Sequence, residues 1–287
     1  MTPLRQKMIH QMRQRGFSER THQSYLYAVT ELAAYFKCPP DKLDANQLQQ
    51  YFDYLVQERE LAPASVRLYL NAVRFLYLNV LEWESFDVPV TIPRIPQRIP
   101  ELLSRREVGA LIGSIDNLKH RTMIVTCYGC GLRLSELVGL CVKDIDSERS
   151  LLRVQQGKGA KDRSVILSAG VLQALRAYWS VCRPVQWLFP NRDPLKALHM
   201  QSVQRIYTKA KIKAGIEKVG GIHALRHAYA THQLEAGMPV HQLQQMLGHS
   251  NIRSTMRYVH WVHTQSDGRG AVSDLVSALE PTNECAR

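Results

Sequence analysis

Apolar residues recur at helical spacing through the first 85 residues. Ser18 precedes one such stretch with Glu19 in its first turn, Asp44 is a candidate N-cap for the next, and Pro63 occupies a first-turn position of a third. The predicted inward-facing residues are Tyr25, Val29, Leu32 and Phe36, then Leu48, Tyr51, Phe52 and Leu55, then Val66, Leu70, Val73, Tyr77 and Leu81. The pattern predicts a small bundle of three or four amphipathic helices.

The helical pattern stops at a proline-rich segment. Residues 86–100 (FDVPVTIPRIPQRIP) hold four prolines and no helical period, which is typical of an extended, semi-rigid linker. Ser104 and Glu107 then form a capping-box pattern at the start of a new helix. The sequence therefore predicts a helical domain over 1–85, a linker over 86–100, a second domain over 101–262 and a tail over 263–287.

The second domain is predicted to be helical apart from one small β region. SLLRVQQ (150–156) and RSVILS (163–168) are short strand-like runs joined by GKGAKD, whose glycines and aspartate favour a turn, so they predict a hairpin. Helices are predicted over 168–181, 199–214, 223–236 and 239–246. The expected fold class is mainly α with a small β-hairpin or sheet in the second domain.

The charge of the chain points toward an anionic partner. Thirty-seven Lys and Arg oppose 25 Asp and Glu, giving +12 and an isoelectric point near 9.5. Residues 1–100 hold 12 basic and 10 acidic side chains, whereas 101–287 hold 25 and 15. Such an uneven excess is the electrostatic footprint of a nucleic-acid binder, although an ordinary basic protein remains the alternative on charge alone.

Other classes of protein fit the sequence poorly. No run approaches the roughly 18 apolar residues of a membrane span, and the first residues contain no apolar signal region, which argues against a membrane or secreted protein. Among six cysteines, Cys127 and Cys130 form a CxxC, but no second pair follows at zinc-ligand spacing. We interpret them as core thiols and expect no metal.

Five short clusters could carry chemistry: GLRLSEL (131–137), GKGAKDR (157–163), HALRH (223–227), LGHS (247–250) and TMRYVH (255–260). Each alone has an ordinary explanation. Arg133 and Glu136 could be a surface ion pair, since they stand three residues apart on a helix. GKGAKD could be a solvated turn, and single histidines or tyrosines are usually structural.

The clusters together fit attack on a phosphodiester. Two guanidiniums can bind the non-bridging oxygens of the transition state, and Arg133 and Arg226 could supply them. A tyrosine beside dense positive charge has its anion favoured and can attack without a metal. A lysine on a hairpin tip is a suitable general acid for the leaving oxygen.

In order, six residues resemble the signature of the tyrosine recombinase (lambda-integrase, phage integrase) family. They are Arg133, Lys158, His223, Arg226, His249 and Tyr258. The resemblance is continuous over 223–260 and covers both predicted domains. It implies a two-domain DNA clamp, in which a helical, SAM-like core-binding bundle is joined to a catalytic domain.

The resemblance implies a role for each residue. Tyr258 would attack a scissile phosphate to form a 3′-phosphotyrosyl link, Arg133 and Arg226 would clamp the phosphate, and Lys158 would protonate the leaving oxygen. No cofactor, divalent metal or ATP would be required.

Three further residues would assist this chemistry. His223 would act in proton transfer at the nucleophile, and His249 would hydrogen-bond the phosphate. Glu136 would support the site. The implied function is site-specific recombination, that is integration, excision or resolution of DNA by a simple Xer-like or mobile-element enzyme; the residues do not distinguish among these outcomes.

The resemblance also implies partners. They are double-stranded DNA with inverted-repeat core sites and other copies of the chain, which would be a monomer or dimer when free and a homotetramer on synapsed DNA. The expected location is the bacterial cytoplasm, on the nucleoid when DNA is bound, with no membrane. The amphipathic segment AVSDLVSAL (271–279) is expected to dock on a neighbouring protomer rather than on its own domain.

DNA-contact residues are predicted less directly. Residues 196–218 carry a local charge of +5, and lysines on such helices usually contact phosphates. The predicted contacts are Arg67, Arg74, Arg205, Lys209, Lys211 and Lys213; for any one of them a solvated helix face is an equal alternative.

Three rival functions fit the sequence less well. A DNA-binding regulator on an inactive recombinase scaffold need not keep the catalytic residues. This sequence has a matching residue at every catalytic position, which argues against that function. A type IB topoisomerase shares the mechanism, but the predicted core-binding domain and LGH motif favour recombination. A metal-dependent nuclease needs a carboxylate cluster, which we do not find in the sequence.

Overall fold

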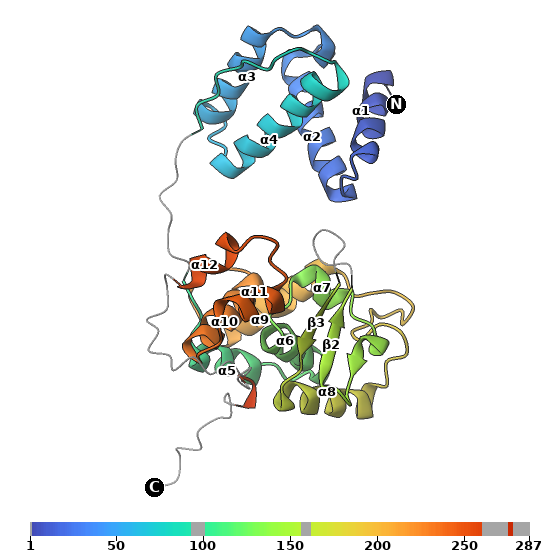
Figure 1. Ribbon diagram of the computed structural model, residues 1–287, viewed down its shortest axis with the longest axis vertical. Helices are drawn as coiled ribbons and strands as arrows, with labels where there is room; N and C mark the ends of the chain where they lie inside the picture. Colours follow the sequence, from blue (N-terminus) through green and yellow to red (C-terminus); the bar gives the residue numbers. More distant parts are fainter. Residues whose placement is uncertain (1, 93–100, 156–161, 260–274, 278–287) are drawn as a thin grey trace. The chain divides into compact units, whose positions relative to one another are not determined.

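The computed structural model describes residues 2–92, 101–155, 162–259 and 275–277. The chain divides into two compact units, Met1–Arg98 and Ile99–Arg287 (Figure 1). Each unit has its own hydrophobic core. Within the described ranges, no helix combines the length and the apolar character needed to cross a bilayer. The chain is mainly helical, with a small antiparallel sheet in the second unit, as the sequence predicts.

The first unit is a helical bundle in which helices begin at the predicted N-cap residues. The Ser18 hydroxyl accepts a hydrogen bond from the backbone N–H of Thr21 (3.2 Å), and Asp44 and Gln47 form a reciprocal capping box. These caps satisfy backbone N–H groups that the first helical turn leaves without partners. The elements are α1 (Pro3–Gln14), α2 (Glu19–Phe36), η1 (Pro40–Lys42), α3 (Ala45–Gln57), α4 (Pro63–Phe75) and η2 (Leu76–Val80).

The end of the bundle departs from the predicted helical register. Helix α4 continues into η2, which is π-helical, so the N–H of Leu81 donates to the carbonyl of Leu76, five residues earlier (2.9 Å). The wider turn shifts the inward-facing positions by one residue. Val80 is therefore fully buried, whereas Leu81, which the spacing predicts to face inward, is only half-buried.

The first part of the predicted linker lies on the bundle. Val88 is buried in the core of the first unit, and Phe86, Val90 and Ile92 pack against it partly exposed. Residues 86–92 are therefore extended chain fixed by apolar contacts. The remainder of the linker, 93–100, lies outside the described residues.

The second unit is built around helix α6, most of which is buried. Every residue of α6 from Thr122 to Gly129 is buried, and α6 packs against α8 and α10. Cys127 and Cys130 are 1% and 0% exposed, which confirms the prediction that they are core residues. The helices are α5 (Arg105–Gly113), α6 (Leu118–Gly129), α7 (Leu134–Val138), η3 (Val142–Asp144), α8 (Ala169–Cys182), α9 (Met200–Lys213), α10 (His223–Glu235), α11 (Val240–Leu247) and α12 (Arg253–Val259).

A three-stranded antiparallel sheet completes the unit. Strands β2 (Leu151–Val154) and β3 (Arg163–Ile166) form the predicted hairpin, with Leu152 opposite Val165. A short strand β1 (Ile145–Asp146), which the sequence analysis did not predict, adds to the free edge of β2. Helix α11 packs on β3 and on α10 and α12 (Figure 1). Segments that are far apart in sequence thereby meet around the end of α11.

We expect the Ser104 cap to stabilise the second unit measurably. The Ser104 hydroxyl accepts from the N–H of Glu107 (3.2 Å), and the Glu107 carboxylate accepts from the N–H of Ser104 (2.7 Å). Ser104→Ala should lower the free energy of unfolding by about 1 kcal/mol, while Ser104→Thr, which keeps the acceptor, should cost only a few tenths. Urea unfolding followed by circular dichroism measures both; equal losses in the two variants would contradict a capping role.

Candidate active site

The turn between α6 and α7 places the first arginine. Gly131 has a φ of +57°, and a Cβ at this position would come within 2.4 Å of the Tyr229 ring, so only glycine fits. Two residues later Arg133 precedes α7, and its backbone N–H donates to the carboxylate of Glu136 (2.8 Å). The backbone contact fixes Glu136 at the start of the helix and orients its carboxylate toward the centre of the unit.

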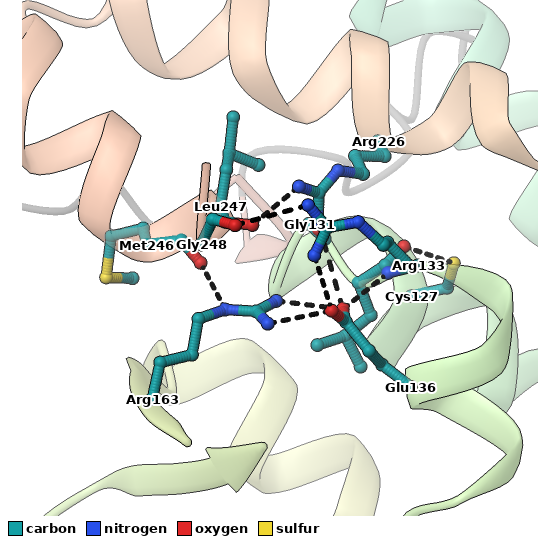
Figure 2. Close-up of polar contacts among 10 residues, drawn as sticks. Cys127, Gly131, Arg133, Glu136, Arg163, Arg226, Met246, Leu247 and Gly248 are labelled. Carbon is teal, nitrogen blue, oxygen red and sulfur yellow. Dashed lines mark hydrogen bonds and ion pairs between the residues drawn. The ribbon is translucent and has the colours of Figure 1, made fainter. Parts of the chain in front are cut away.

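Glu136 binds the guanidinium groups of three arginines (Figure 2). Arg163 donates to both carboxylate oxygens at 2.8 Å, and Arg133 donates through Nη1 at 2.7 Å. The Nη1 of Arg226 lies 3.8 Å from Oε2. Burial alone would raise the pKa of Glu136, but the hydrogen bonds from Arg163 and Arg133 outweigh it and lower that pKa to about 2. The carboxylate is therefore charged near neutral pH.

The C-terminal end of α11 binds the same arginines from the opposite direction. The carbonyls of Met246, Leu247 and Gly248 accept from Arg163 (2.9 Å), Arg226 (2.6 Å) and Arg133 (3.3 Å), respectively. These are carbonyls that a helix end leaves without intrahelical partners, and the helix dipole makes them favourable for cations. Gly248 ends the helix in the left-handed conformation (φ +62°), and a Cβ there would lie 2.9 Å from Arg163.

The cluster keeps an excess of positive charge. One carboxylate opposes three guanidiniums, so the group carries a net charge of +2. Burial, and then the charge of Arg133, lower the pKa of Arg226 to about 10. The Arg226 side chain is 1% exposed, whereas that of Arg133 is 22% exposed and reaches solvent. Such a site is suited to an anion with several acceptor oxygens, such as a phosphodiester.

Tyr258 and two histidines lie beside this cluster. The Nδ1 of His227 is 2.8 Å from the Tyr258 hydroxyl, and the His249 ring is nearly parallel to the phenol ring, with centroids 6.4 Å apart. The Nδ1 of His249 is also 2.9 Å from the hydroxyl of Thr255, one turn before Tyr258 on α12. His223 is exposed, and its ring centroid lies 4.6 Å from that of His227.

Burial decides the protonation of these groups. Burial raises the pKa of Tyr258, and the nearby Arg226, Arg257 and Arg133 offset this only in part. The arginine charges favour the phenolate, as the sequence predicts, but in the free protein burial outweighs them because the phenol is 4% exposed and loses its hydration. Burial and neighbouring positive groups lower the pKa of His227 and of His249 to about 4, so both rings are neutral near pH 7.

Most of the predicted site residues come together around the end of α11. Arg133, Glu136 and Arg226 share one network, and His249 and Tyr258 adjoin it. His223 is one turn from His227 on α10. Lys158 lies outside the described residues, although β2 and β3 on either side of it are described and Arg163 of β3 is part of the cluster.

Sequence reasoning missed three residues. Arg163 and His227 lie inside the clusters GKGAKDR and HALRH, which we singled out, but neither was given a role. Thr255 begins the TMRYVH cluster and is fully buried against His249. The sequence feature that indicates Arg163 is a charged residue at the start of a strand that must pack on a helix. The feature that indicates His227 is a second histidine one helical turn after His223.

Comparison with known proteins identifies the family. The family model described as "Phage integrase family" matches residues 101–264, and the model described as "Phage integrase, N-terminal SAM-like domain" matches residues 4–85. The chain belongs to the phage integrase family of tyrosine recombinases. Members of this family carry out site-specific DNA recombination, so the enzyme class is DNA strand cleavage and religation.

Relatives cover nearly the whole recombinase. It is 41% identical over 284 residues to y4qK, an integrase/recombinase candidate of Sinorhizobium fredii, covering 98% of this chain and 92% of that protein. It is 30% identical over 266 residues to the tyrosine recombinase XerD of Vibrio vulnificus, covering 86% and 87%. A structure of the Tn1549 transposon integrase with circular intermediate DNA resembles it with a TM-score of 0.70 at 21% identity, covering 93% and 98%.

The residues predicted to contact DNA are mostly exposed. Arg67 and Arg74 lie on one face of α4, and Arg205 and Lys209 are exposed on α9. Lys211 is half-buried, and Lys213 is exposed but pairs with Asp116 (2.7 Å). Phosphate contact by Lys213 would compete with this ion pair, which is a surface pair of small value. Their contacts with DNA stay a prediction.

Three residues of the predicted docking segment are described. Leu275 is 2% exposed and belongs to the core of the chain's own second unit. A Cβ at Gly129 would lie 2.9 Å from a methyl group of Val276, so this residue also approaches α6. In the single chain, Leu275 and Val276 therefore pack on their own unit. The rest of 263–287 lies outside the described residues.

The depressed pKa of Glu136 predicts a specific acid sensitivity. Its stabilising contribution is fully present above its ordinary pKa of 4.5 and is lost as the pH falls to about 2. We expect this loss to be about 3 kcal/mol of unfolding free energy. Glu136→Gln should lack this pH dependence and be less stable near neutral pH by about 3–5 kcal/mol, because the arginines lose their counter-charge.

Chemical denaturation between acid and neutral pH tests this prediction. The matched control is Glu148→Gln, because Glu148 is exposed. It should keep the full wild-type pH dependence. A Glu136→Gln variant that tracks the wild type across the acid range would show that the carboxylate is not the charge on which the cluster depends.

Proposed function

We propose that this recombinase cuts and rejoins DNA through a 3′-phosphotyrosyl link on Tyr258. The observation that carries the proposal is the hydroxyl of Tyr258, which lies 2.8 Å from a histidine Nδ1 and beside a cluster of three arginines and one glutamate with net charge +2. In the step, the Tyr258 oxygen bonds to phosphorus, the bond to the 5′ oxygen breaks, and a 5′-hydroxyl leaves after protonation. The reverse attack by a 5′-hydroxyl reseals the strand.

Arg133 and Arg226 bind the scissile phosphate in this proposal. Arg133 is partly exposed and approaches the phosphate from the solvent side, whereas Arg226 forms the floor of the site. Both guanidiniums are already held by Glu136 and by carbonyls of α11, so little reorganisation is needed when charge develops on the non-bridging oxygens. Glu136 acts by orienting the arginines.

The remaining predicted residues handle protons. Lys158 protonates the leaving 5′ oxygen, and His223 takes part in proton transfer at the nucleophile. His249 donates a hydrogen bond to the phosphate: when the Thr255 hydroxyl donates to Nδ1, the proton of the neutral ring lies on Nε2. Because the phosphotyrosyl link conserves the energy of the broken phosphodiester, religation requires no ATP, and the step uses no divalent metal.

The partners in the reaction are duplex DNA and further copies of the chain. The DNA-bound structure of the Tn1549 integrase, which shares this fold, supports a DNA partner. We propose inverted-repeat core sites and a homotetramer that synapses two of them. In that assembly the segment around Leu275 would move from its own unit to the same position on a neighbour, an exchange of identical contacts.

Removal of the Tyr258 hydroxyl should abolish covalent attachment to DNA. Nicked duplexes tiled across the DNA that flanks the gene for this chain are incubated with protein in EDTA and separated on a denaturing gel. Wild-type protein should give a slowly migrating protein–DNA adduct, and Tyr258→Phe should bind the same DNA but give none. The matched control is Tyr229→Phe, because no hydrogen-bond partner is present for the buried Tyr229 hydroxyl among the described residues.

This control should form the adduct at the wild-type rate. Adduct surviving in Tyr258→Phe would remove Tyr258 as the nucleophile. Tight binding without adduct by the wild type on every duplex would contradict the proposed chemistry.

Lys158 is tested by the leaving group. Lys158→Ala should slow cleavage of an ordinary phosphodiester by about 10²-fold or more, since general acids contribute this much. On a substrate with a 5′-bridging sulfur, which leaves without protonation, the same variant should cleave at nearly the wild-type rate. Lys143→Ala, an exposed lysine of the same unit, is the control. Equal slowing on both substrates would exclude Lys158 as the acid.

A further inference from the structure

His227 contacts the proposed nucleophile directly. Its Nδ1 lies 2.8 Å from the Tyr258 hydroxyl, and the centroids of the two rings are 5.6 Å apart. The contact joins α10 to α12, which pack against each other. The resemblance to the family assigns proton transfer to His223, yet His223 is exposed and its ring lies beside that of His227.

The direction of this hydrogen bond follows from the charges. The Tyr258 hydroxyl is protonated, since its pKa is raised by burial, and His227 is neutral because its pKa is lowered to about 4. A protonated phenol donates, so Nδ1 of His227 accepts and the ring proton lies on Nε2. Nδ1 therefore presents its lone pair to the one proton that must leave before Tyr258 can form a bond to phosphorus.

We propose that His227 is the general base that takes the Tyr258 proton during DNA cleavage. The inference rests on the proposed function and adds a residue to it. As the Tyr258 oxygen bonds to phosphorus, its O–H bond breaks and the proton passes to Nδ1, giving a His227 imidazolium. The 5′ oxygen leaves with a proton from the general acid, so charge and atoms balance. Religation returns the proton from His227 to Tyr258.

The positive groups around His227 make the base responsive to DNA. They are Arg257 on α12 and Arg226 on its own helix, and after burial they disfavour a positive charge on the ring, as does the adjacent titratable His223 whenever it is protonated. A phosphate bound by the arginines would offset that charge and increase the proton affinity of His227. The base is then weak in the free protein and stronger when a phosphodiester occupies the site, which limits activation of the nucleophile to the DNA complex.

The test separates proton acceptance from positioning. In His227→Asn, the side-chain amide oxygen can occupy the place of Nδ1 and accept the phenol hydrogen bond, but it cannot take the proton. We expect single-turnover adduct formation on the nicked duplexes to fall about 10²-fold or more in this variant, with DNA binding unchanged. His241→Asn, the same change at an exposed histidine of α11, should keep the wild-type rate.

The pH profile and chemical rescue supply independent readouts. The wild-type rate should rise with pH as His227 loses its proton in the DNA complex, and that limb should disappear in His227→Asn. In His227→Ala, added imidazole should restore adduct formation in proportion to the concentration of its neutral form, which a purely structural role would not produce.

The outcomes also distinguish this inference from the function on which it rests. Wild-type adduct together with a fully active His227→Asn variant would overturn the base and leave the phosphotyrosyl mechanism intact. Faster adduct formation in His227→Asn would also overturn it, because His227 would then restrain Tyr258. Absence of adduct in the wild type, with DNA bound, would instead contradict the proposed function itself.

Discussion

The second unit depends on one electrostatic arrangement, in which the guanidinium groups of three arginines are held between a carboxylate and a helix end. Glu136 supplies the only full negative charge among the residues described in this cluster, and the carbonyls of Met246, Leu247 and Gly248 supply partial ones. Either group alone would leave guanidinium N–H groups buried without acceptors, at a cost of several kcal/mol per ion. Together they hold α7, β3, α10 and α11 in a single geometry.

That geometry also explains the reactivity we assign. The cluster is neutralised only in part, so the site is pre-organised and still attractive to an anion. Tyr258 lies beside it with its proton in place, because burial outweighs the field of the arginines. The protein thus separates two tasks that sequence reasoning had combined: the arginines prepare for the phosphate, and a neutral histidine beside the phenol receives its proton. The second task falls to His227 in our proposal.

Much of this was predictable from the chain alone, and the omissions have physical causes. Caps such as Ser18 and Asp44, the β2–β3 hairpin and the buried CxxC follow from local pattern and composition. The burial of Val80 in place of Leu81 could not be predicted, because a π-helical turn leaves no periodic signature in a sequence. Arg163 was missed because its acceptors, Glu136 and the Met246 carbonyl, come from segments 27 and 83 residues away.

The arginine acceptors on α11 are main-chain atoms, and this affects how the site tolerates change. Replacing the side chain of Met246 or Leu247 would alter core packing but would leave the accepting oxygens where they are, provided the helix ends at the same residue. Gly248 is different, since its left-handed conformation and its contact with Arg163 exclude a side chain. Related enzymes could therefore diverge widely at these two positions and still bind the same arginines. The acceptors on this side of the arginines depend on the course of the backbone, so a comparison of side chains between related sequences would not reveal them.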